Sequence, residues 1–111
     1  MQDGIYHVHF SSSAGVLGEG LAVIKQGAVN GGDPGYVYTG AISLNGGTMS
    51  GRLNIKQWNP AVPSVFGPLK NFDLQLTGQS NGSNSFTAAG GVATQPNLTI
   101  NIKGQFVSHA A

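Results

Sequence analysis

Strict alternation of apolar and polar residues is the feature that most restricts how this chain can fold. In NFDLQLTG, residues 71–78, every second side chain from Phe72 to Leu76 is apolar, and NLTINIKGQF (97–106) and GRLNIKQW (51–58) repeat the pattern. A period of two puts alternate side chains on opposite faces of a strand, whereas an amphipathic helix has a period of about 3.6 residues. The pattern therefore predicts strands with one face in a core and the other in water.

The first half of the chain carries further strand patterns. DGIYHVHF (3–10) and GYVYTGAISL (35–44) alternate in the same way, and short strands are expected near AVNGG (28–32) and SFTAAGG (85–91). GEGLAVIKQG (18–27) is apolar on both faces, which predicts a strand that is central or covered on its outer side. Glycine-rich turns separate these segments, so we expect an all-β fold, an antiparallel up-and-down barrel of about eight strands. A barrel of this size holds only side chains or one small ligand.

The prolines of NPAVPSVFGPLK, residues 59–70, interrupt the strand pattern. Pro63 suits the first position of a helix and Gly67 suits its end, so we expect one short helical turn at 63–66. This segment would cap one end of the barrel. The sequence shows no linker and no low-complexity tract, so we expect a single β-barrel domain, residues 1–111.

Composition restricts the partners and the location. Charged residues are only 8% of the chain, with a formal net charge of +1. The five Lys and Arg residues are scattered singly, whereas nucleic-acid binding requires several phosphates to be neutralised together. No apolar run reaches the roughly 20 residues of a membrane-spanning helix, and no signal-peptide pattern opens the chain. We expect a cytoplasmic protein that binds neither nucleic acid nor membrane, and the absence of cysteine suits that compartment.

Two histidines form the only motif with metal-binding spacing. His7 and His9 lie two residues apart, on one face of an expected strand, where imidazoles can share an ion. A third ligand would have to come from Glu19, Asp33 or His109, and nothing in the spacing brings one of them to the pair. We therefore expect two outward-facing polar side chains and no metal.

The remaining polar residues do not form a recognisable catalytic pattern. The chain has four carboxylates in all, and those beside turn glycines or on a polar strand face suit structural roles. Glu19, between two glycines, is the exception, and either a structural role or contact with a partner is open for it. No general base lies at a recognised motif spacing from the serine run at 11–13, and no sequence motif of a phosphate-binding loop is present. We expect no enzymatic activity and no cofactor.

Five aromatic residues are candidates to line the barrel interior. They are Tyr36, Tyr38, Trp58, Phe66 and Phe72. They fit either an ordinary packed core or a cavity that binds an apolar small molecule, and a cavity requires an underfilled core that the sequence does not reveal.

Four motifs, in this order, resemble the GrlR family of negative regulators of type III secretion: DGIYHVHFSS, GEGLAVIKQG, GGDPGYVYTGAIS and PSVF. The resemblance covers residues 3 to about 70, and the last strands match by pattern. It implies a small lipocalin-like barrel that forms a homodimer, has a hydrophobic cavity suited to lipid-like ligands, and keeps a transcriptional activator off DNA. Gly31, Gly32 and Asp33 would then form a turn that is a signature of the fold.

One segment departs from the family pattern. The family's activator-binding feature is an acidic run, E-D-E-D, shortly after the strand that follows the Gly31–Asp33 turn. The matching positions here are Leu44, Asn45, Gly46 and Gly47, with no acid. They remain the candidate partner-binding residues, but an acidic patch against a basic partner does not carry over.

The predicted function is non-catalytic regulation by protein–protein binding, with a transcriptional regulator of type III secretion as the expected partner. The surface would be polar and weakly charged, with strand edges free to pair. The alternative is a lipocalin-like barrel that binds a small apolar or lipid-like molecule.

Overall fold

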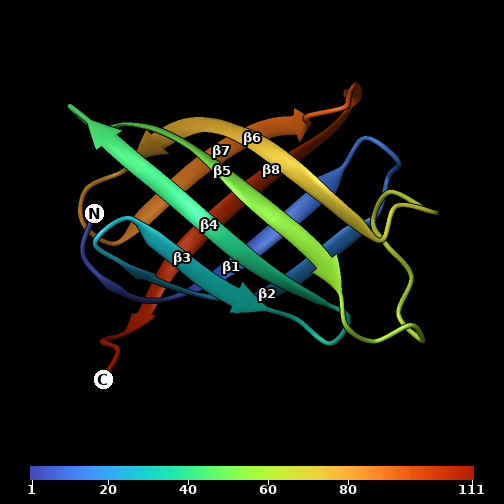
Figure 1. Cartoon of the computed structure of the whole chain (residues 1–111). Helices are drawn as coiled ribbons and strands as arrows, with labels where there is room; N and C mark the ends of the chain where they lie inside the picture. Colours follow the sequence, from blue (N-terminus) through green and yellow to red (C-terminus); the bar gives the residue numbers. More distant parts are fainter.

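The computed structural model describes residues 1–111 and consists of one closed antiparallel β-barrel (Figure 1). Each strand pairs with the next along the chain, and the last pairs with the first. The eight strands are β1 (Gly4–Ser12), β2 (Leu17–Lys25), β3 (Ala28–Gly32), β4 (Tyr36–Asn45), β5 (Thr48–Gln57), β6 (Asn71–Ser80), β7 (Ser85–Val92) and β8 (Gln95–Ser108). The predicted fold class is confirmed, including the two short strands β3 and β7.

Alternation along the strands separates the core from the surface as predicted. In β6 the even-numbered residues Phe72, Leu74 and Leu76 are buried, and in β1 Tyr6 and Val8 are buried while His9 is exposed. The core cluster contains 18 buried hydrophobic residues drawn from all eight strands and from the segment between β5 and β6. Burial of such side chains, each worth about 1.5–3 kcal/mol, is the main stabilising contribution.

The outer face of β2 differs from the expectation. Leu21 is 51% exposed and Leu17 is 79% exposed, so nothing within this chain covers the apolar outer side of the strand. The inward residues Ala22 and Ile24 are buried as in any strand of the barrel. The second apolar face is therefore a surface feature and not a sign of a central strand.

The segment between β5 and β6 closes one end of the barrel, at the right of Figure 1. Phe66 is buried against Phe72, with ring centroids 5.5 Å apart, and the Ser12 hydroxyl donates to the Val65 carbonyl oxygen at 2.9 Å. The expected capping role is confirmed, but the helical turn at 63–66 is wrong. Residues 64–67 form a tight turn in which the Gly67 N–H donates to the Ser64 carbonyl at 3.2 Å.

The helical turn fails for a local reason. The Ser64 hydroxyl accepts the Phe66 N–H at 3.0 Å, which fixes a tight turn in place of a helical bond pattern. Gly67, with φ of 68°, ends this tight turn as it was expected to end the helical one. No helix of the structure is long and apolar enough to cross a membrane.

Gly31 marks a close approach between β2 and β3. A Cβ atom at this position would lie 2.2 Å from the Leu21 carbonyl oxygen and 2.7 Å from the Ala22 Cα. Both neighbours are backbone atoms of a paired strand, so they cannot move without breaking the sheet pairing. Glycine is required here by space and not by backbone conformation.

We expect Gly31→Ala to lower the free energy of unfolding by about 1–3 kcal/mol, because the added methyl group overpacks the β2–β3 contact. Urea denaturation followed by circular dichroism measures the change. Gly91→Ala is the matched control, since its added Cβ would meet no atom closer than 3.3 Å. Equal losses in the two variants would contradict the close-approach explanation.

Candidate functional site

Asp33 organises the turn between β3 and β4. Its Oδ1 accepts the backbone N–H groups of Gly35 and Tyr36, both at 2.8 Å, and its other carboxylate oxygen accepts the Tyr38 hydroxyl. The Asp33 N–H in turn donates to the Tyr36 carbonyl at 3.0 Å. The turn itself is Asp33–Gly35, while Gly31 and Gly32 are the last residues of β3. Asp33 is thus fully engaged in structure, as an Asx-type turn residue.

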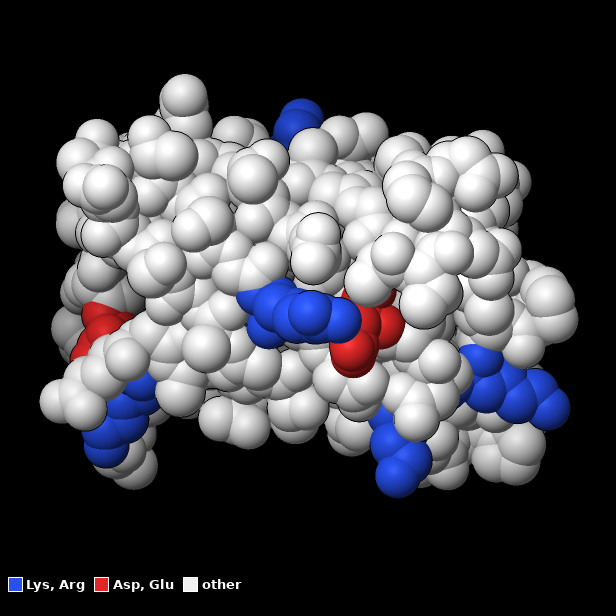
Figure 2. Space-filling view, turned by 45° about the horizontal axis from the view of Figure 1, so that its top comes forward, with Lys and Arg blue, Asp and Glu red and all other residues white.

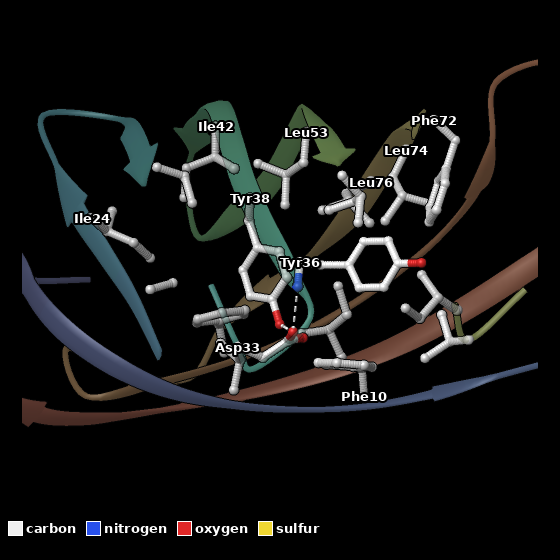
Figure 3. A pocket seen from close by; sticks show the side chains of 18 of the residues that line it. Phe10, Ile24, Asp33, Tyr36, Tyr38, Ile42, Leu53, Phe72, Leu74 and Leu76 are labelled. Carbon is white, nitrogen blue, oxygen red and sulfur yellow. Dashed lines mark hydrogen bonds between the residues drawn. The ribbon is translucent and has the colours of Figure 1, made fainter. Parts of the chain in front are cut away.

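The barrel encloses a small apolar cavity (Figure 3). Its volume is about 90 Å³, and 18 of the 20 residues that line it are hydrophobic. Asp33 and Ser64 are the two polar lining residues. The walls come from both ends of the barrel and include Phe10, Ile24, Val65, Phe72, Leu74 and Phe86. For comparison, an apolar cavity of about 150 Å³ binds benzene.

The five aromatic candidates occupy different places. Tyr36, Tyr38 and Phe72 line the cavity, and Phe66 lies buried behind Phe72 in the closing segment without lining it. Trp58 is 57% exposed, and its indole N–H donates to the Asp33 carbonyl oxygen at 3.0 Å. Its predicted placement in the cavity was wrong. The inward residues of β5 are odd-numbered, as Leu53 and Ile55 are, so Trp58 has the parity of the outer face, and it lies just beyond the end of the strand at Gln57.

The two cavity tyrosines differ in their hydroxyl environments. The Tyr38 ring points toward Asp33, and the Tyr36 ring extends the other way along the cavity (Figure 3). Burial, followed by the hydrogen bond to the Asp33 carboxylate, raises the pKa of Tyr38 well above its usual range. The Tyr36 hydroxyl is buried without any hydrogen-bond partner. An unpaired buried hydroxyl costs about 1–3 kcal/mol, so Tyr36 is a weak point of the core or a contact for a bound molecule.

The candidate partner-binding residues form the hairpin tip between β4 and β5. Leu44 and Asn45 end β4, and Gly46 and Gly47 make a two-residue turn with φ of 61° and 89°. Positive φ at both central residues is the geometry of a type I′ hairpin. The tip is exposed, Leu44 by 42%, and it lies at the barrel end opposite the segment between β5 and β6.

The prediction that no third ligand lies near the two histidines was wrong. Glu19 of β2 pairs directly with His9 of β1, and its Oε2 lies 2.9 Å from His7 Nε2 and 3.4 Å from His9 Nε2. The three side chains share the outer face of the β1–β2 hairpin. An antiparallel hairpin folded about Ala14 brings residues 9 and 19 together, and the turn residues in SSSAG were the available signal.

The remaining acidic residues are held in structural contacts. Asp73 accepts from the Asn54 amide and from Arg52, and these contacts, the Asn54 hydrogen bond first, lower the pKa of Asp73. Asp3 accepts the Gln26 N–H at 3.1 Å. Lys and Arg side chains lie apart from one another on the mostly uncharged face shown in Figure 2.

Comparison with known proteins adds to this geometry. A family model described as "T3SS negative regulator, GrlR" matches residues 1–109. The chain belongs to the GrlR family. The resemblance found in the sequence is thereby confirmed, and it extends beyond the first 70 residues to the last strands. GrlR proteins are thus described as negative regulators of type III secretion.

The fold also resembles a solved structure described as a redesigned beta barrel. The two share 12% sequence identity with a TM-score of 0.66, over 96% of this chain and 91% of that one. At this identity the similarity concerns the fold alone. A search of curated proteins found no match.

Replacing each cavity tyrosine by phenylalanine should give opposite effects. We expect Tyr38→Phe to cost about 1.5–3 kcal/mol, because it removes a hydrogen bond to a carboxylate, and Tyr36→Phe to be neutral or stabilising, because it removes an unpaired hydroxyl. Chemical denaturation of both variants beside the wild type measures the difference. A larger loss in Tyr36→Phe than in Tyr38→Phe would refute the assigned hydroxyl environments.

The raised pKa of Tyr38 predicts that stability falls at alkaline pH. In the unfolded chain tyrosine ionises near its ordinary pKa of about 10, while folded Tyr38 keeps its proton. The unfolded state therefore binds fewer protons above that pH, and stability declines by up to about 1.4 kcal/mol per pH unit. Stability measured from pH 8 to 11.5 should show this decline, and Tyr38→Phe should show a shallower one. Identical slopes would contradict the assignment.

Proposed function

We propose that this protein is a non-catalytic negative regulator that acts in the cytoplasm by binding another protein, a transcriptional activator of type III secretion genes. The observation that carries the proposal is the match of a single regulator family to residues 1–109, nearly the whole barrel. Asp33 is the one acid at the cavity, and both of its carboxylate oxygens accept hydrogen bonds within the protein, which supports a binding function over a catalytic one. Direct contact with nucleic acid or membrane is no part of this function.

Closure of the barrel restricts how such a partner is bound. Every strand has two neighbours, so no strand is free along its whole length to pair with a partner, contrary to the expected free edges. Binding must use side chains on the outer face or at the two ends. Two surfaces are available, one at each end of β4.

The first surface is apolar. Leu21 of β2 and Val37 of β4 flank Gly32 of β3, one on each side, and both are exposed. Gly32 has no side chain to separate them. The indole of Trp58 lies over the adjoining Asp33 carbonyl. We propose that this apolar surface, Leu21, Val37 and Trp58, is where two copies form a homodimer, because homodimer interfaces are more apolar than other surfaces.

The second surface is the hairpin tip, Leu44, Asn45, Gly46 and Gly47. It lies roughly 24 Å along β4 from Val37, at about 3.4 Å per residue. A dimer formed through the apolar surface therefore leaves the tip free for the activator. Without acids the tip would bind through the Leu44 side chain and the exposed backbone, and the affinity would depend little on salt.

Native mass spectrometry and a transcription reporter together test this function. We expect the wild type to be a dimer that lowers transcription of type III secretion genes when expressed in its host. Leu21→Ser combined with Val37→Ser should give a monomer, and Leu44→Ser should stay dimeric but repress less. Val107→Ser, at another exposed apolar position, is the control. Unchanged transcription with the wild-type protein would overturn the regulatory function, and a dimer unaffected by the double substitution would overturn the interface.

A second candidate function is binding of a small molecule in the cavity, and the unpaired Tyr36 hydroxyl favours it. The volume of about 90 Å³ is too small for a fatty acid and smaller than a benzene-sized cavity. A lipid-like ligand would require the segment between β5 and β6 to move outward. Trp58 is the first residue of this segment, so its fluorescence would report the movement although its side chain lies outside the cavity. Extra mass on the gently purified wild type that Tyr36→Phe loses would support this function, whereas a bare protein mass would contradict it.

A further inference from the structure

We propose that His7, His9 and Glu19 form a binding site for one divalent transition-metal ion of the zinc class on the outer face of the barrel. The site lies outside the cavity and adjoins the proposed dimer surface, because His7 lies opposite Leu21 in the β1–β2 pairing. It depends on two neighbouring strands, β1 and β2, which place two imidazoles and one carboxylate on the same side of the sheet.

Distances between the donor atoms fit a single ion. His7 Nε2 and His9 Nε2 lie 2.9 and 3.4 Å from Glu19 Oε2, and all three ligand atoms lie within 4.8 Å of one another. In a tetrahedral site with metal–ligand bonds of 2.0–2.1 Å, neighbouring donors are roughly 3.3 Å apart. Small side-chain rotations therefore bring the three donors to one ion.

The backbone fixes this arrangement before any ion binds. His9 and Glu19 are directly opposed across the β1–β2 pairing, and His7 lies two residues before His9 on the same face, opposite Leu21. The imidazole ring centroids are 4.1 Å apart. Because β1 is hydrogen-bonded on both sides in the closed barrel, the ligands lie on a rigid element and not on a loop.

The donor set selects the kind of ion. Two imidazole nitrogens with one carboxylate suit Zn²⁺, Ni²⁺ and Cu²⁺, whereas Mg²⁺ and Ca²⁺ prefer all-oxygen sites. The side chains of His9 and Glu19 are 60% and 65% exposed, so water or a partner's side chain can complete the coordination. Lys103 of β8 lies opposite His9 on the other side of β1 and is the nearest fixed positive charge in the pairing. Its charge opposes the ion, so removing it should tighten binding.

The alternative is an ion pair without a metal, in which the protonated imidazoles donate to Glu19. The two alternatives differ in what happens when metal is offered. A metal site saturates at one ion per chain and needs all three side chains, whereas an ion pair shows no stoichiometric binding of added metal.

Isothermal titration calorimetry with zinc chloride, on the full chain without any affinity tag, tests the proposal. We expect one zinc ion per chain, with His7→Gln, His9→Gln and Glu19→Gln each weakening binding at least about tenfold, since even loss of an outer contact to a ligand costs roughly 10–100-fold. His109→Gln is the matched control, because His109 packs beside Phe106 outside the cluster, and it should bind like the wild type. Magnesium chloride should give no heat of binding, and Lys103→Gln should bind zinc more tightly.

Histidine side-chain NMR gives a second measurement that separates one shared site from scattered binding. Zinc should shift the imidazole signals of His7 and His9 together, at equal metal concentration, and leave His109 unchanged. Circular dichroism melts confirm that the outward-facing variants remain folded. Absence of saturable binding in the wild type, wild-type affinity in His9→Gln, or loss of binding in His109→Gln would each overturn the proposal.

Discussion

Pairing of β1 with β8 is the interaction on which the rest of this structure depends. It converts a meander of eight strands into a closed sheet. Each strand then pairs with two others, and the inward side chains share one interior. An interior of this size is nearly filled by the side chains that the alternating pattern supplies. The same closure leaves no strand of this GrlR family member without a neighbour on either side.

Two tyrosines of β4 point into this interior and differ in whether their hydroxyl groups find a hydrogen-bond partner. Both Tyr36 and Tyr38 point inward from β4, where their rings add apolar area, but only Tyr38 reaches the turn carboxylate. The Asp33 carboxylate therefore has two structural roles, because it accepts the backbone N–H groups that close the turn and the buried Tyr38 hydroxyl. The hydroxyl of Tyr36 has no such neighbour. The volume of about 90 Å³ limits the size of any molecule that this cavity could hold beside the hydroxyl.

The sequence predicted the features that depend on local pattern and missed those that depend on register. Period-two alternation located the strands and their buried faces, because inward residues such as Leu74 must be apolar whichever strands pair with one another. It did not place Glu19 beside His9, because that contact depends on where the β1–β2 hairpin turns. Trp58 was placed wrongly although the alternation of β5 already assigns even-numbered residues to the outer face, where its indole N–H donates to the Asp33 carbonyl oxygen. The cavity volume depends on side-chain packing, which no sequence pattern encodes.

Because β1 and β8 are neighbours in the closed sheet, the two chain ends could be joined and the chain opened at another turn without changing which strands pair. Ile5 lies opposite Ser108, and both ends of the chain lie at the same end of the barrel (Figure 1). A short peptide joining them would turn the chain into a ring without altering any strand pairing, and the exposed Gly46–Gly47 turn offers a place to open it. The closed sheet therefore does not depend on which strand comes first in the chain, and circular permutants should retain the same strand pairings.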